Sequence, residues 1–147
     1  MSSFENQITA LVESAESICM EAEKSRWNGQ GWSPSIILGH IVDVDTEVWM
    51  PRFEMMRNAM NINAAIPQLS WWEPDAQKTS EKYSSTSLDE AKNTLRTSRQ
   101  SMARYLSELS VQERSALAEH RTFGTITIES MLQVILDHDQ EHRASLN

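Results

Sequence analysis

The chain has 147 residues, a length that suits one domain able to bury its own core without disulfides. Its formal net charge of -8 and the lack of any lysine or arginine cluster argue against a nucleic-acid partner, because a polyanion would be repelled. The N-terminus lacks the basic start and apolar run of a signal peptide, and no stretch reaches the roughly 18 apolar residues of a membrane span. We therefore expect a cytoplasmic protein with no membrane partner, and a single domain over residues 1–147.

A first amphipathic helix is predicted near the N-terminus. Apolar residues recur at three- and four-residue steps from Ile8 to Ala22, and Ser2 and Glu5 form a capping-box pattern ahead of them. Cys19 lies on this apolar stripe, which predicts a buried thiol and not a reactive one.

The second helix follows two glycines at positions 29 and 31. Ser33 and Pro34 give the cap-then-proline pattern that starts a helix, and the apolar period continues to about Asn61. Pro51 lies inside this range and predicts a kink, because proline removes one helical hydrogen bond.

Residues 62–86 have two prolines and no sustained helical period, which predicts a long crossover. The third helix follows, because Ser87 and Glu90 give a capping box and an apolar stripe runs on to Leu109. The chain is therefore expected to be an all-α four-helix bundle with a long crossover between helices two and three.

A short helical turn is predicted from Ser110 and Glu113 to about Glu119. The residues that follow, from His120 to Gly124, are expected to form a loop, with His120 on the surface. The fourth helix is predicted to begin near Thr127, and no credible alternating strand is expected.

Three histidines border the predicted core. His138 and His142 are four residues apart on the fourth helix, so their rings project from one side and could share an ion. His40 lies near the apolar stripe of the second helix. Three imidazoles can form an open metal site, but three hydrogen-bonded core histidines explain the same pattern equally well.

Several acidic residues accompany these histidines. Asp139 falls close to the centre of the fourth helix's apolar stripe, so it either orients a ligand histidine or pairs with another helix. Asp43 and Glu47 lie on the His40 side of the second helix and are either carboxylates close to the metal site or part of a solvated face. His138, Glu141 and His142 match the H-x-x-E-H pattern of inverzincin peptidases, but we reject that interpretation because those enzymes take a third ligand well downstream.

Two segments, residues 31–43 and 137–143, resemble the DinB family. The family's marks are a tryptophan and a helix cap before a histidine of helix two, and an H-x-x-x-H pair on the last helix. They fall here on Trp32, Ser33, His40, His138 and His142. The resemblance implies a four-helix bundle with a long crossover, three histidine ligands for a divalent ion such as zinc or nickel, and a homodimer.

The resemblance also implies a class of reaction. Characterised DinB relatives are thiol-dependent transferases and isomerases that use low-molecular-weight thiols such as mycothiol, bacillithiol or glutathione. We therefore expect a thiol S-transferase acting on an electrophilic substrate, with Glu47 or Asp139 handling protons and Trp71 and Trp72 lining the pocket. A metal-dependent hydrolase and a non-catalytic bundle that binds metal or another ligand remain open alternatives.

Overall fold

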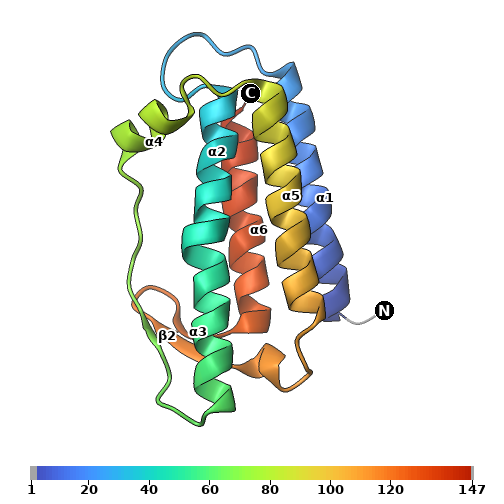
Figure 1. The fold of residues 1–147 in the computed structure, drawn as a ribbon, viewed down its shortest axis with the longest axis vertical. Coiled ribbons are helices and arrows are strands. Elements are labelled where there is room, and N and C mark those ends of the chain that lie inside the picture. Colours follow the sequence, from blue (N-terminus) through green and yellow to red (C-terminus); the bar gives the residue numbers. More distant parts are fainter. Residues whose placement is uncertain (1–2, 147) are drawn as a thin grey trace.

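Four long helical segments pack side by side in the computed structural model, which describes residues 3–146 (Figure 1). They are α1 (Ser3–Lys24), a rod made of α2 (Pro34–Val44), a π-helical turn (Asp45–Trp49) and α3 (Met50–Asn61), α5 (Leu88–Ser107), and α6 (Ile128–Ser145). α1 packs against α5 and α6, and α5 packs against α2. α2 and α5 run in the same direction, as the long crossover between them allows (Figure 1).

Side-chain caps start these helices largely where the sequence predicts. The Ser33 hydroxyl accepts a hydrogen bond from a backbone N–H at the start of α2, and Ser87 does the same for α5. Thr127 caps α6 through a reciprocal pair of hydrogen bonds with Ser130. The predicted capping box of α1 depends on Ser2, which lies outside the described residues.

The second helix reaches Asn61 as predicted, but its irregularity at Pro51 is a π-helical turn. The Met50 N–H bonds to the carbonyl of Asp45, five residues back, just before the proline. Proline has no N–H and its ring crowds the carbonyl four residues earlier, so one extra residue in the preceding turn relieves the conflict. The ribbon continues from α2 into α3 (Figure 1).

The expectation of a purely α-helical chain is wrong, because a small sheet lies beside α3. Its strands are β1 (Gln68–Leu69), β2 (Leu117–His120) and β3 (Gly124–Thr127), in the order β1-β2-β3. β1 pairs parallel to β2, and β2 pairs antiparallel to β3. Gly124 has a φ of 72°, the left-handed conformation that favours glycine at the hairpin turn.

Two shorter predictions also need correction. Ser110 and Glu113 do form a reciprocal capping box, but only a 3-10 turn (Glu113–Ser115) follows before the chain enters β2. The crossover contains a helix, α4 (Ala76–Tyr83), whose start is capped by Asp75. Eight residues are too few for an apolar period to stand out in the sequence.

α4 is held against α2 beside the bundle. Asp43 of α2 accepts hydrogen bonds from the Lys82 ammonium at 2.8 Å and from the Tyr83 hydroxyl at 2.5 Å. The Tyr83 ring lies directly over Gly39, where an added Cβ would meet ring carbons at 2.5 Å. The sequence suggested either a carboxylate close to the metal site or a solvated residue for Asp43. In the structure Asp43 instead binds α4 through these two hydrogen bonds.

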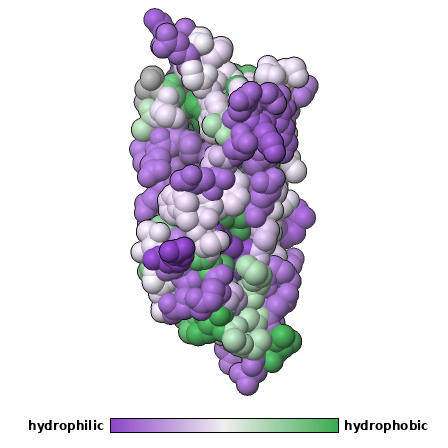
Figure 2. Space-filling model, turned by 90° about the vertical axis from the view of Figure 1, so that its left-hand side faces the viewer, coloured by the Kyte–Doolittle hydropathy of each residue, from purple (hydrophilic) through white to green (hydrophobic). Residues whose placement is uncertain are grey.

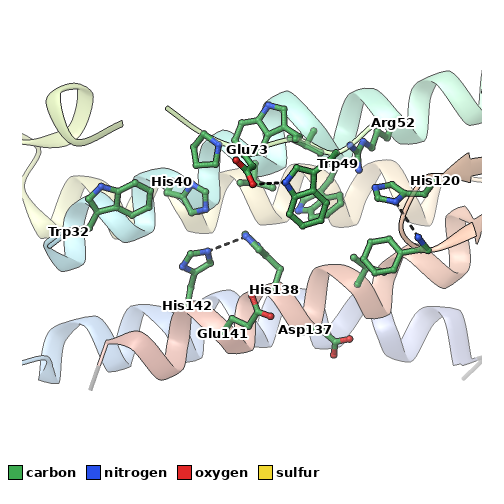
Figure 3. A pocket seen from close by; sticks show the side chains of 17 residues that line it. Trp32, His40, Trp49, Arg52, Glu73, His120, Asp137, His138, Glu141 and His142 are labelled. Carbon is green, nitrogen blue, oxygen red and sulfur yellow. Dashed lines mark hydrogen bonds between the residues drawn. The ribbon is translucent and has the colours of Figure 1, made fainter. Parts of the chain in front are cut away.

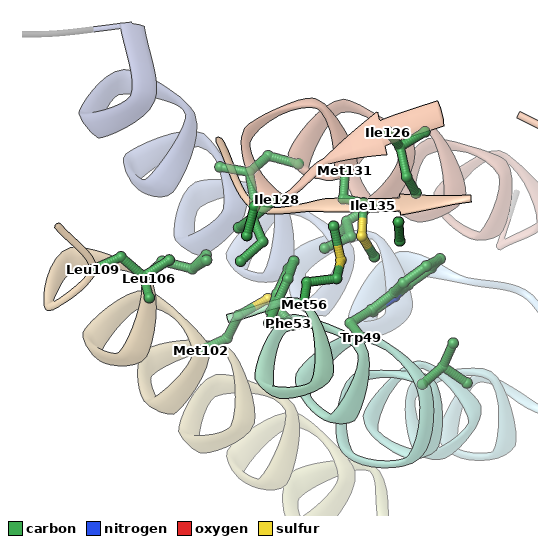
Figure 4. Close-up of a cluster of buried hydrophobic side chains, with 14 of the residues drawn as sticks. Trp49, Phe53, Met56, Met102, Leu106, Leu109, Ile126, Ile128, Met131 and Ile135 are labelled. Carbon is green, nitrogen blue, oxygen red and sulfur yellow. The ribbon is translucent and has the colours of Figure 1, made fainter. Parts of the chain in front are cut away.

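The core is two apolar clusters with a charged layer between them. Figure 4 shows the cluster around Phe53, Met56 and Leu106, and the second cluster contains the buried thiol of Cys19, as predicted. In the layer between them Arg99 of α5 is 1% exposed. Among residues 3–146, no helix is long and apolar enough to cross a membrane.

Arg99 ties three helical segments together. Its guanidinium donates to both carboxylate oxygens of Asp139 on α6, at 2.6 and 3.0 Å, and to Asp45 in the π-helical turn at 3.3 Å. Burial lowers the pKa of Arg99, but the two carboxylates outweigh that effect and hold the guanidinium charged. This ion pair fixes the π-helical turn and α6 relative to each other.

Candidate metal centre

Three histidines meet where α2 and α6 face each other (Figure 3). His40 comes from α2, and His138 and His142 come from α6. The ring centroids of His40 and His142 are 4.6 Å apart, and those of His138 and His142 are 4.5 Å apart. One nitrogen from each of the three rings lies within 4.8 Å of the other two. The sequence-based prediction that these rings converge is confirmed.

The environment keeps these imidazoles neutral. Burial lowers the pKa of His40 to about 4, with a further contribution from His142 and His138. Burial and His142 lower the pKa of His138 to about 4, and burial also lowers that of His142. Because a neutral imidazole has a free lone pair, all three rings are in the form that binds a metal near neutral pH.

The arrangement fits a divalent ion. The Nε2 atoms of His138 and His142 are 3.1 Å apart. Two nitrogens at the usual zinc distance of roughly 2.0–2.1 Å in a tetrahedral site are separated by about 3.3 Å, which is close to this value. This contact can also be a hydrogen bond between the two rings, but the buried Nδ1 atoms of His40 and His138 have no hydrogen-bond partner among residues 3–146, so hydrogen bonds within the described chain do not satisfy every ring nitrogen.

The histidines form one wall of a pocket of about 540 Å³. Trp32 packs 5.1 Å from the His40 ring, centroid to centroid, and its indole N–H donates to the carbonyl of Ala76 in α4. Trp72 of the crossover stacks 6.4 Å from the same histidine. The crossover and α4 thus close the side of the bundle that α2 and α6 leave open.

The two tryptophans that the sequence singled out both line this pocket. Trp72 is half-buried and packs against the core, whereas Trp71 is 59% exposed. The Trp71 indole N–H donates to Glu73, which lines the pocket too. Their role toward a ligand stays a prediction.

The two carboxylates predicted to handle protons lie away from the pocket lining. Asp139 is 1% exposed and is occupied by Arg99 and by the Ser14 hydroxyl at 2.8 Å, which is the structural pair that the sequence left open. Glu47 is on the exposed face of the π-helical turn, the alternative of a solvated face. The carboxylates that do line the pocket are Glu73, Asp137 and Glu141.

The predicted position of His120 is wrong. It was expected on the surface, but it is 5% exposed and lines the pocket at the end far from the three histidines (Figure 3). β2 is the central strand of the sheet, so His120 is flanked by Leu69 on one side and by Gly124 on the other. The alternation of threonine and isoleucine in residues 125–128 could have revealed this hairpin.

Arg52 was also missed. This α3 residue lines the same end of the pocket, and its guanidinium carbon is 5.8 Å from the Trp49 ring centroid. Position 52 follows a proline on a helix predicted to kink, so the sequence did not show which way it faces.

Comparison with known proteins identifies a match to one family, the DinB superfamily. The sequence model of the DinB superfamily matches residues 3–146. The solved structure of YfiT from Bacillus subtilis is similar, with a TM-score of 0.74 and 18% sequence identity, and the match covers 99% of this chain and 86% of YfiT. YfiT is described as "a probable metal-dependent hydrolase with an unusual four-helix bundle topology". No curated protein matches this chain.

Proposed function

The chain belongs to the DinB superfamily, and on that premise we propose that it is a metal-dependent thiol S-transferase. The observation that carries the proposal is the meeting of His40, His138 and His142, all neutral, at the wall of a pocket of about 540 Å³. Three histidines leave at least one coordination position open, as catalytic zinc sites do. Zinc or nickel suits an all-imidazole ligand set.

A bound divalent ion supplies a Lewis acid that lowers the pKa of a thiol or of water in the open position. The chain's own residues set the conditions for that chemistry. Trp32 and Trp72 cover His40 and limit access of water. The pocket has room for a small thiol and an electrophilic substrate together.

Glu141 is the carboxylate that we propose as proton acceptor, in place of Glu47 and Asp139. It lines the pocket, directly precedes His142 in the chain and is exposed, so a proton can pass from it to water. The Glu141→Gln variant keeps the shape and removes the base. It should lower turnover and leave metal content unchanged.

Metal-dependent hydrolysis is the second candidate, and the description of YfiT favours it. The two reactions need the same ion and differ in the nucleophile. They separate when untagged, zinc- or nickel-loaded protein is mixed with a chromogenic ester or an aryl halide, each with and without glutathione or cysteine. Thiol-dependent product release supports the transferase, and equal turnover without thiol overturns it.

The His142→Ala variant is the control for these assays, because it removes one ligand from an edge of the pocket. Any turnover that survives in this variant does not come from the metal centre. A wild-type protein that holds metal but turns over neither substrate would favour the non-catalytic alternative.

We also propose a homodimer through the apolar end of α3. Met56 is buried, but Met55, Met60, Ile62 and Ile66 are 46%, 37%, 75% and 42% exposed. Apolar side chains gather at the lower end of the face in Figure 2, and patches of this kind often mark interfaces. Light scattering should report a dimer that Ile62→Glu dissociates and that Met20→Glu, on exposed α1 surface, leaves intact.

A further inference from the structure

The end of the pocket far from the three histidines carries two hydrogen-bond donors that the proposed chemistry does not use. They belong to His120 on β2 and Arg52 on α3 (Figure 3), and Phe123 lines the pocket as well. The His120 ring is 4.7 Å from the Phe123 ring, centroid to centroid. Both polar side chains belong to regular elements and not to free loops.

The hairpin fixes the tautomer of His120. Its Nδ1 atom accepts hydrogen bonds from the backbone N–H groups of Thr122 at 3.0 Å and Phe123 at 3.3 Å. Burial, and secondly the charge of Arg52, lower the pKa of His120, so the ring is neutral and its one proton is on Nε2. Among residues 3–146 this Nε2–H group has no hydrogen-bond acceptor, and it is not one of the fully buried polar atoms, so it is accessible to a ligand in the pocket.

Arg52 is a half-buried cation without a carboxylate partner in the described chain. One Nη2–H donates to the carbonyl of Ser70 at 2.7 Å, which fixes the guanidinium beside Trp49. No carboxylate of residues 3–146 forms an ion pair with it. Its remaining N–H groups are therefore free for an anion that enters the pocket.

We propose that Arg52 and His120 form a subsite for a carboxylate group of the ligand. A planar guanidinium can donate two parallel hydrogen bonds to a carboxylate, and the imidazole N–H adds a third donor. The apolar rings of Trp49 and Phe123 fit a hydrophobic body next to that carboxylate.

The geometry also limits the length of the ligand. Trp49 lies between the two ends of the pocket. Its ring centroid is 6.1 Å from the His138 ring centroid and 5.8 Å from the Arg52 guanidinium carbon. The His138 ring and the Arg52 guanidinium are therefore no more than about 12 Å apart. A small molecule with a carboxylate at one end and a reactive centre at the other can span this distance. The placement of the reactive end at the three histidines rests on the proposed function, whereas the carboxylate subsite does not.

The other charges of the pocket disfavour a dianion more than a single negative charge. Glu73, Asp137 and Glu141 also line it and are exposed, and Glu73 and Asp137 accept hydrogen bonds from Trp71 and Gln133. A dianion such as phosphate would meet more repulsion from these three groups than a carboxylate does. The carboxylate could come from the thiol cosubstrate or from the electrophile.

The subsite can be tested without metal. We would titrate chelator-treated protein with 3-phenylpropanoate and with its neutral amide, and follow the tryptophan fluorescence. The acid should bind on the order of tenfold or more tightly than the amide. Arg52→Gln should remove this preference, Arg52→Lys should reduce it, and Arg121→Gln, on the exposed hairpin, should leave it unchanged.

Equal binding of acid and amide by the wild-type protein would overturn the subsite, and so would full acid affinity in Arg52→Gln with an unchanged circular dichroism spectrum. In the metal-loaded enzyme, comparing 3-mercaptopropionate, which carries a carboxylate, with 2-mercaptoethanol, which does not, shows whether the carboxylate belongs to the thiol or to the electrophile. Arg52→Gln should raise KM only for the reactant that carries the carboxylate, and an unchanged KM for every such reactant would contradict the proposal. Absence of turnover in wild type would reject the enzymatic function and leave the binding result valid.

Discussion

Replacing Asp139 by asparagine should destabilise the fold and leave the metal centre able to form. Asp139 accepts two hydrogen bonds from Arg99 and one from Ser14, and an asparagine has only one acceptor oxygen with which to replace them. Loss of one hydrogen bond to a charged group costs about 1.5–3 kcal/mol. Loss of a whole partner from a buried ion pair costs about 3–5 kcal/mol. Since Asp45 remains beside Arg99, we expect a loss of about 2–4 kcal/mol.

Urea unfolding of metal-free protein, followed by circular dichroism, measures this loss directly. Glu47→Gln is the matched control, because Glu47 is exposed and its free energy of unfolding should change by no more than about 0.5 kcal/mol. An Asp139→Asn variant as stable as wild type that nevertheless fails to bind metal would refute the structural role. Asp139 would then act on the metal centre itself.

Three further predictions concern other parts of the fold. Gly39→Ala should displace Tyr83, because the new Cβ would meet its ring at 2.5 Å, and hydrogen exchange should then speed up selectively in residues 76–83. The Cys19 thiol, which is fully buried and whose pKa burial raises, should react with a thiol reagent only as fast as the protein unfolds, and fast labelling of native protein would contradict its placement. Hydrogen bonds from Asn61, Ser110 and Arg57 lower the pKa of Glu113 to about 2, so its contribution to stability is present above about pH 4.5 and is lost as the pH falls towards 2. The difference in stability between wild type and Glu113→Gln should therefore shrink from pH 7 to pH 2.5, and a constant difference would count against these contacts.

Much of the bundle could be predicted because its determinants are local. A stripe of apolar residues and a cap define each long helix, and the same period places His40, His138 and His142 at the edges of two stripes. Their convergence in the structure follows from the packing of those stripes into one core. The sequence alone could not decide between a metal site and three core histidines, because either arrangement uses the same faces.

The remaining features depend on contacts between distant segments. β2 pairs with β1 across the whole of α4 and α5, so no short window of sequence contains the reason that His120 is buried. Arg99 lies 40 residues from Asp139, and its place in the core becomes reasonable only when both carboxylates are in position. Arg52 faces the pocket because a π-helical turn resets the helix just before it. These non-local contacts shape the pocket, which is why the helices were easier to predict than the full site.

The most direct test of the account is the metal content of the protein purified without a histidine tag. After loading with zinc or nickel and removal of free ion, elemental analysis should find about one ion per wild-type chain and little in His142→Ala, because removal of one of three ligands weakens the site severely. The variant should remain folded by circular dichroism, since His142 is only half-buried. Equal and near-zero metal in both proteins would contradict the metal centre and the function proposed from it.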